Sequence, residues 1–267
     1  MLRGCAIAAI VTAVLLPALY AVAMSLRPGD EIADDPLGLP TSLFLGNYAA
    51  VLQTMNYLRA VANTLGITVV VTMLVALASS AAAYPLARLP GALTRALYLM
   101  LTLGIAIPLF VTLTPLYVLF RNLGLLNSYL GIVIAYTAVN VPLGVFFYTS
   151  FIRSLPPDLD EAAQIDGANL LQVYWHVILP LLRPVTATLA FFVTLSVWND
   201  LVYPLVFLTD DRKFTITVAV FRFLGSHGLD PTQLFPAAVL GTLPLVAVFF
   251  LLQRRIVSGI TAGAVKG

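Results

Sequence analysis

The chain has 267 residues, of which 60% are hydrophobic and 10% charged, with a formal net charge of +2 and a mean hydropathy of +0.98. This composition excludes an ordinary soluble domain, and a small net charge without a basic run excludes nucleic acid as a partner. One cysteine excludes an intrachain disulfide, and two distant histidines leave no metal site. The sequence predicts an all-α integral membrane protein.

Six apolar segments each approach the length of about 20 residues that a helix needs to cross a bilayer. We expect them to form one transmembrane domain over residues 1–267. The first could instead be a cleaved signal peptide, because Arg3 precedes it and Ala21–Val22–Ala23 resembles a cleavage site. Its length favours a retained helix. The expected crossings are at about 5–26, 60–87, 96–120, 129–151, 185–208 and 234–253.

The distribution of Lys and Arg predicts the orientation of these crossings. With the N-terminus inside, eight basic residues face the cytoplasm and six face outward, and the long outer loops 27–59 and 209–233 count for less. Both termini and the loop 152–184 are therefore expected in the cytoplasm. The inner set is Arg3, Arg88, Arg95, Arg153, Arg183, Arg254, Arg255 and Lys266.

The outer loop 27–59 carries four acidic residues and then a short apolar run, Tyr48–Leu52, which we expect to form an interfacial helix. Further along, Pro108 and Pro115 in the third crossing and Pro142 in the fourth predict bent helices, because proline removes a backbone hydrogen bond. Such helices are suited to line a cavity.

Two polar side chains in the fourth crossing, Tyr136 and Asn140, accompany that bend. Asn140 lies near the middle of its segment, where an unpaired amide is unfavourable in hydrocarbon. It is therefore expected to face protein or a hydrated path.

The loop 152–184 is expected to form a helix, a turn and a second helix outside the hydrocarbon. Pro156 and Pro157 suit a helix start, where the amide that proline lacks is not needed. Asp158, Asp160 and Glu161 place negative charge at the positive end of the helix dipole. Gly167 can adopt the left-handed backbone that ends the helix, and an apolar helix from Leu170 to Leu179 follows. Small side chains near the turn would let another protein approach closely.

This loop resembles the EAA loop of the membrane subunits of binding-protein-dependent ABC importers. The resemblance implies a cytoplasmic coupling helix, between the fourth and fifth crossings, that docks into a groove on an ATP-hydrolysing subunit. The alternative is a solvated loop without a partner. By this resemblance the ATPase-coupling residues are Glu161, Ala162, Ala163, Asp166, Gly167 and Ala168, and the matching segment continues through Ile178, Leu179–Pro180–Leu181 and Pro184.

Asp200 is the only acidic residue inside an expected crossing, so it must be paired, hydrated or protonated there. Trp198–Asn199–Asp200, with Pro204–Leu205 after it, resembles a stretch of the sugar-importer permeases that helps to line the central path. The alternative is structural, with Asn199 and Asp200 bonding the backbones of neighbouring helices or capping an outer break near Pro204. The candidate path residues are Tyr136, Asn140, Trp198, Asn199, Asp200 and Tyr203.

The C-terminal residues 253–267 are similar to the tail of the carbohydrate subgroup of this family, which reaches the ATPase subunits. The resemblance implies tail contacts by Gly263 and Lys266; the alternative is a frayed terminus.

The resemblance implies a permease subunit that imports a carbohydrate, such as a disaccharide, an oligosaccharide or a polyol or sugar phosphate, across the bacterial cytoplasmic membrane by alternating access. The chain contains no Gly-x-x-x-x-Gly-Lys loop for nucleotide phosphates. We therefore expect it to be no enzyme and to bind no cofactor, with ATP and Mg²⁺ held by separate subunits. There are two alternatives. One is a secondary carrier that uses Asp200 for proton coupling, and the other is a membrane-embedded enzyme. The expected partners are a homologous second permease, two ATPase subunits, an extracytoplasmic sugar-binding protein and membrane lipid.

Overall fold

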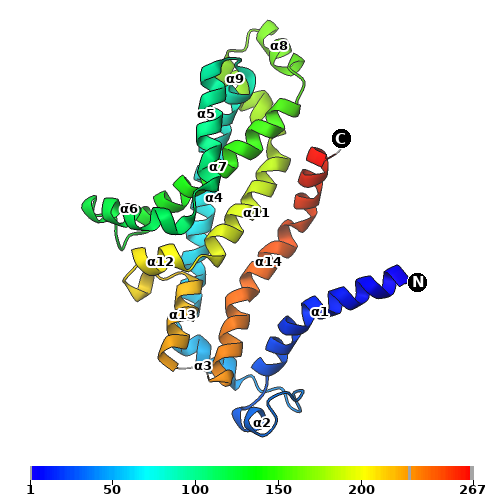
Figure 1. The fold of residues 1–267 in the computed structure, drawn as a ribbon, viewed down its shortest axis with the longest axis vertical. Helices are drawn as coiled ribbons and strands as arrows, with labels where there is room; N and C mark the ends of the chain where they lie inside the picture. Colours follow the sequence, from blue (N-terminus) through cyan, green and yellow to red (C-terminus); the bar gives the residue numbers. More distant parts are fainter. Residues whose placement is uncertain (1, 228–229, 265–267) are drawn as a thin grey trace. The chain divides into compact units, whose positions relative to one another are not determined.

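The computed structural model describes residues 2–227 and 230–264, and every regular element in those ranges is a helix (Figure 1). The expected all-α class is confirmed. The chain forms two compact units: Met1–Asn63 with Phe214–Ala247, and Thr64–Lys213 with Val248–Gly267.

The first unit contains α1 (Leu2–Ser25), α2 (Gly29–Asp34), α3 (Gly46–Thr54), the beginning of α4 (Tyr57–Arg88), α13 (Ile216–His227) and much of α14 (Pro231–Ala264). α3 confirms the helix expected around Tyr48–Leu52. The segment 209–233, expected as a loop, instead contains α13, whose Val218 is fully buried. The buried, apolar side chains of that segment favour a packed helix over a solvated connector.

A buried arginine organises the segment between α1 and α3. Arg27 is 1% exposed and donates to the carbonyls of Glu31 at 2.7 Å and Gly38 at 3.1 Å. Its Nε lies 3.5 Å from the Glu31 carboxylate, which accepts from the Thr41 amide at 2.7 Å. The amide of Thr41, with the nearby Arg27 charge, lowers the pKa of Glu31 below its ordinary value. The segment between α1 and α3 is therefore folded around the guanidinium group of Arg27.

In the second unit, α7 (Tyr129–Ser154) packs against α11 (Arg183–Asn199) and α5 (Ala92–Leu103). α4 approaches α7 closely, because a Cβ on Gly144 would collide with Ser79, whose hydroxyl donates to the Val141 carbonyl at 3.2 Å. Small residues thus allow two helices to pack tightly, as expected for membrane helices.

The expected crossing at 96–120 is interrupted. α5 runs into a short 3-10 helix, η1 (Gly104–Ala106), and α6 (Leu109–Asn122) leaves at an angle of 101°. Pro108 lies at the break with an extended backbone, since its ring removes the amide that a continuing helix would need. Pro115 lies inside α6, and Pro142 inside α7, without ending either helix. The bend expected from Pro108 is confirmed and is much sharper than a kink.

Two other expected crossings have different bounds. The segment 185–208 divides into α11 and α12 (Val202–Phe207), with Asp200 between them. The helix expected at 234–253 continues to Ala264 as part of α14, so Gly263 lies in a helix. Lys266 lies outside the described residues.

Within the described residues, three helices are long and apolar enough to cross a membrane, and two bent pairs raise the number to five if each pair is one span. In α1 the apolar stretch Ile10–Ser25 is shorter than these spans. The count of six crossings stays a prediction. The three long spans are Tyr57–Arg88, Tyr129–Ser154 and Pro231–Phe250; the pairs are Ala92–Ala106 with Leu109–Asn122 and Leu170–Leu181 with Arg183–Asn199.

Candidate functional site

A short polar helix follows α7 and ends in a tight turn. α8 (Asp158–Ile165) begins after Pro157, and Gly167 has a φ of +87°, which confirms the left-handed turn expected from the sequence. The amides of Gly167 and Ala168 donate to the carbonyls of Gln164 and Ala163, each at 3.0 Å. These bonds satisfy carbonyl groups at the end of the helix that would otherwise lack partners.

The next helix begins with a capping box. The Asn169 side chain accepts from the Gln172 amide at 2.9 Å, and the Gln172 side chain accepts from the Asn169 amide at 2.8 Å. α9 (Leu170–Val173) then passes through a π-helical turn, η2 (Tyr174–Ile178), into α10 (Leu179–Leu181) and α11. The turn at Gly167 is therefore followed by the helical stretch Leu170–Leu181, which meets α11 at a break at Leu182 where the chain bends by 71°.

Asp160 fastens α8 to the end of α4. Its carboxylate accepts from the Tyr84 hydroxyl at 2.8 Å and pairs with the Arg88 guanidinium at 2.8 Å. Arg88 also donates to the Leu155 carbonyl at 3.1 Å. Asp160 is 6% exposed, so α8 is held by a largely buried charge pair. The contacts of Asp160 thus attach α8 to the end of α4.

The outer surface of the turn is uncovered. Of the six expected coupling residues, Glu161, Ala162, Asp166 and Gly167 are exposed, and the remaining two are half-buried. Apart from Gly167 itself and its two neighbours in the chain, no heavy atom lies within 4 Å of the position of a Cβ on Gly167. The structure therefore leaves room for another surface to approach the backbone at this turn.

Large apolar side chains that are not among the predicted coupling residues surround this turn. Ile165 is 86% exposed and Leu171 is 66% exposed, and Leu170 and Trp175 are also exposed. The sequence feature that could have identified this apolar surface is an apolar residue, such as Ile165, beside charged and amide side chains. Exposed apolar side chains next to a polar helix are typical of a surface that another protein covers.

A second cluster lies at the break between α11 and α12. Asp200 accepts from the Tyr136 hydroxyl at 2.9 Å and from the amides of Val202 and Tyr203 at 2.9 and 3.2 Å. The Tyr203 hydroxyl is 2.9 Å from that of Thr112 on α6, and its ring meets Tyr136 edge to face. The structure thus brings together Tyr136, Asp200 and Tyr203.

The other three candidate path residues have different surroundings. Asn140 is buried and donates to the Tyr136 carbonyl at 2.8 Å, and Trp198 is 2% exposed. Asn199 is exposed, and its amide donates to the Leu195 carbonyl at 3.0 Å. The bonds that Asp200 accepts from the amides of Val202 and Tyr203 correspond to the capping part of the structural alternative, whereas Asn199 bonds the backbone of its own helix. Contact with a substrate remains a prediction for all six.

The described residues contain no group of three or more His, Cys, Asp or Glu side chains positioned for a metal ion. The fold is that of an all-helical membrane protein with bent spans around a polar cluster and a short exposed helix between α7 and α11. Residues 75–262 match the family described as the binding-protein-dependent transport system inner membrane component, and the chain belongs to this family.

Relatives and solved structures agree with this assignment. The chain is 34% identical over 229 residues to the melibiose/raffinose/stachyose import permease protein MelC of Bacillus subtilis, covering 85% of this chain and 83% of MelC. It is 33% identical over 255 residues to the trehalose transport system permease protein SugB of Mycobacterium tuberculosis, covering 95% of this chain and 93% of SugB. A chain of a bacterial ABC transporter involved in the import of alginate superposes with a TM-score of 0.81 at 23% identity, covering 95% and 94%, which supports the fold.

Proposed function

We propose that the chain is a permease subunit of an ATP-driven importer that translocates a carbohydrate across the bacterial cytoplasmic membrane. Its relatives include the trehalose permease SugB and the melibiose/raffinose/stachyose permease MelC, which are matched over most of their length. Hydroxyl, amide and carboxylate groups with aromatic rings, as found in the cluster around Asp200, are the groups that recognise sugar hydroxyls.

In this proposal the chain acts in an assembly. A homologous permease, two ATPase subunits that hold ATP and Mg²⁺, and an extracytoplasmic sugar-binding protein complete the importer. The sequence contains no phosphate-binding loop of its own, which supports separate ATPases. α1 supplies a sixth crossing, both termini and α8 face the cytoplasm, and the tail with Gly263 and Lys266 contacts the ATPases.

The observation that carries the proposed function is the construction of α8. Its outer surface is uncovered, whereas its inner side is tied to α4 through Asp160, Tyr84 and Arg88. The chain after Gly167 continues into α11, which ends at Asp200. Movement of a bound ATPase would therefore reach two membrane helices at once, which is what alternating access requires. Helices broken near Pro108 and Asp200 are suited to rearrange around a path.

Co-purification tests this role. The intact chain, isolated in mild detergent with its native partners, is expected to carry an ATPase subunit. Replacement of residues 161–167 by a Gly/Ser linker is expected to release that subunit. The chain remaining bound to the ATPase after this replacement would contradict the proposal.

A finer test uses Gly167, whose positive φ disfavours most side chains. Gly167→Asn is suitable because Asn tolerates the left-handed conformation, so the turn is kept while bulk is added to the docking surface. Gly167→Asp adds bulk and charge and is expected to abolish uptake with near-normal protein levels. The Gly167→Asn variant is expected to show ATPase-coupled uptake that is severalfold weaker. Full coupled uptake in both variants would be incompatible with docking at this turn.

A further inference from the structure

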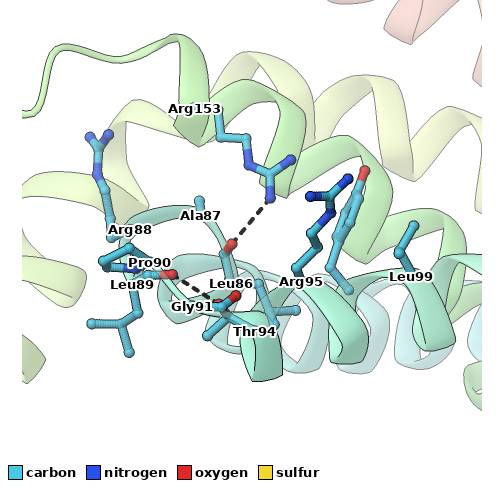
Figure 2. Close-up of a pocket in the computed structure, with 11 residues that line it drawn as sticks. Leu86, Ala87, Arg88, Leu89, Pro90, Gly91, Thr94, Arg95, Leu99 and Arg153 are labelled. Carbon is cyan, nitrogen blue, oxygen red and sulfur yellow. Dashed lines mark hydrogen bonds between the residues drawn. The ribbon is translucent and has the colours of Figure 1, made fainter.

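A pocket of about 420 Å³ lies where α4 ends and α5 begins, close to α8. Figure 2 shows the side chains that line it. They come from the end of α4, the Pro90–Gly91 connection, the first turns of α5 and the end of α7. None of the residues that line this pocket is acidic, and three of them are arginines: Arg88, Arg95 and Arg153.

The three arginines are engaged to different degrees. Arg88 is paired with Asp160 on α8, and in Figure 2 its side chain turns away from the other two. Arg153 lies over the Tyr98 ring at 4.7 Å and donates to the Leu86 carbonyl at 3.3 Å. Among the described residues no carboxylate lies within ion-pair distance of Arg95 or Arg153, and both are exposed.

Arg95 and Arg153 converge on the same part of the pocket. Arg95 precedes Tyr98 by three residues, which places both on one face of α5, and Arg153 reaches over Tyr98 from α7. Two cations that share a pocket repel each other unless an anion lies between them. A guanidinium group can donate two parallel hydrogen bonds to phosphate oxygens. The pocket is therefore suited to a phosphate group.

The surroundings of the pocket are apolar. α5 contains no buried residue, and its Leu93 and Met100 are 72% and 73% exposed, with Leu97 and Leu103 also exposed. Leu99 itself lines the pocket. A ligand with a phosphate head and a hydrocarbon body would fit both the arginines and this helix surface. Free phosphate would contact only the arginines.

We propose that this pocket binds the phosphate headgroup of an anionic membrane phospholipid, with Arg95 and Arg153 as its ligands. The inference rests on the membrane placement in the proposed function, since basic pockets between membrane helices on the cytoplasmic side bind such headgroups. Arg88 lines the same pocket and holds Asp160, so the bound lipid lies beside the attachment of α8. The lipid is thereby placed to influence how firmly α8 is held.

Lipid binding can be measured on the purified full-length chain in mild detergent by native mass spectrometry. The titrated probes are phosphatidylglycerol, zwitterionic phosphatidylcholine and inorganic phosphate. We expect phosphatidylglycerol to bind in preference to phosphatidylcholine. The double variant Arg95→Gln/Arg153→Gln is expected to bind it roughly tenfold more weakly or worse, because each basic residue near the surface adds to the attraction. Arg121→Gln/Arg183→Gln, which removes the same two positive charges at exposed sites on α6 and α11, is the control and should bind like the parent chain.

Equal binding by the parent and the double variant would overturn the proposal. Displacement of phosphatidylglycerol by millimolar inorganic phosphate would contradict the proposal that the pocket binds a lipid. It would identify the pocket as a site for free phosphate. Arg95→Lys/Arg153→Lys keeps both charges and should retain part of the binding, which separates loss of the ligands from loss of the fold. The assay detects lipid on this chain alone. Failure of the ATPase co-purification would thus contradict the proposed function without affecting this result.

Discussion

Three neighbouring acidic residues at the start of α8 show how differently similar side chains are used. The sequence placed Asp158, Asp160 and Glu161 together at the positive end of a helix dipole. In the structure Asp160 is buried against Tyr84 and Arg88, whereas Asp158 and Glu161 are exposed. The partners of Asp160 come from more than seventy residues earlier in the chain. No local pattern could therefore have distinguished it from its neighbours.

We predict that Asp160→Asn lowers the thermal stability of the detergent-solubilised protein. The variant removes the charge that pairs with Arg88, and a hydrogen bond to a charged group contributes about 1.5–3 kcal/mol. Glu161→Gln makes the same charge change at an exposed site and should leave the melting temperature unaltered. Melting curves that fall equally for both variants would show that Asp160 has no special attachment role.

Gly167 illustrates the opposite case at the same scale. Its left-handed backbone was predictable because helix ending by glycine is a local property of three or four residues. Ile165, only two residues before it, could not be assigned an exposure from local pattern alone. Its exposure depends on which elements of the fold leave that side of α8 uncovered.

At the scale of elements, proline spacing predicted bends but not their size. Pro108 lies at the break before α6, whereas Pro115 and Pro142 are accommodated inside continuous helices. Beside the break, Gly104 packs so closely on Pro142 that a Cβ there would be 2.8 Å from the proline ring. Such a contact between η1 and α7 depends on tertiary packing that proline positions alone do not determine.

The break between α11 and α12 leads to a prediction about Asp200. Asp200→Ala removes the acceptor of three hydrogen bonds and should lower the melting temperature, since each bond contributes about 0.5–1.5 kcal/mol. Asp200→Asn keeps one carbonyl oxygen and should melt much closer to the parent. If Asp200 also contacts substrate, Asn will raise the KM of sugar uptake despite near-normal melting. Normal uptake by the Asn variant would restrict Asp200 to its capping role.

The segment between α1 and α3 provides a prediction about pH. The pKa of Glu31 is lowered in the folded chain, so its contribution to stability is present above the ordinary glutamate pKa and is lost as pH falls through the lowered value. Protease cleavage between Asp35 and Leu45 is therefore expected to increase only in strongly acidic solution. Glu31→Gln should be cleaved more readily at neutral pH and show a smaller change on acidification. Identical cleavage profiles for the two proteins would exclude this role of Glu31.

At the scale of the whole molecule, composition was sufficient to predict the class, because 60% hydrophobic residues can be accommodated only in a membrane or an unusually large core. The number of crossings was harder to predict. Hydropathy treats the segment 96–120 as one span, but α5 and α6 meet at 101° and could enter and leave on one side. An apolar segment that crosses and one that returns have the same composition, so the sequence cannot separate them.

Cysteine labelling distinguishes the two arrangements. Cys5 is the only cysteine, so Cys5→Ser provides a background in which single cysteines can be placed. At exposed positions, Gln164→Cys on α8 is expected to react with a membrane-impermeant maleimide only after cells are opened, and Gln53→Cys on α3 in intact cells. Gln53→Cys, which precedes the α5–α6 pair in the chain, calibrates the outer side of the membrane, and Gln164→Cys reports the side on which α8 lies. If α5 and α6 form one bent crossing, Ala92→Cys will behave like Gln164→Cys and Asn122→Cys like Gln53→Cys. Protection of both Ala92→Cys and Asn122→Cys in intact cells, together with labelling of Gln164→Cys there, would instead mean that the pair re-enters. The assignment of basic residues to the two sides of the membrane would then change for every later helix, because the following crossings would run in the opposite direction.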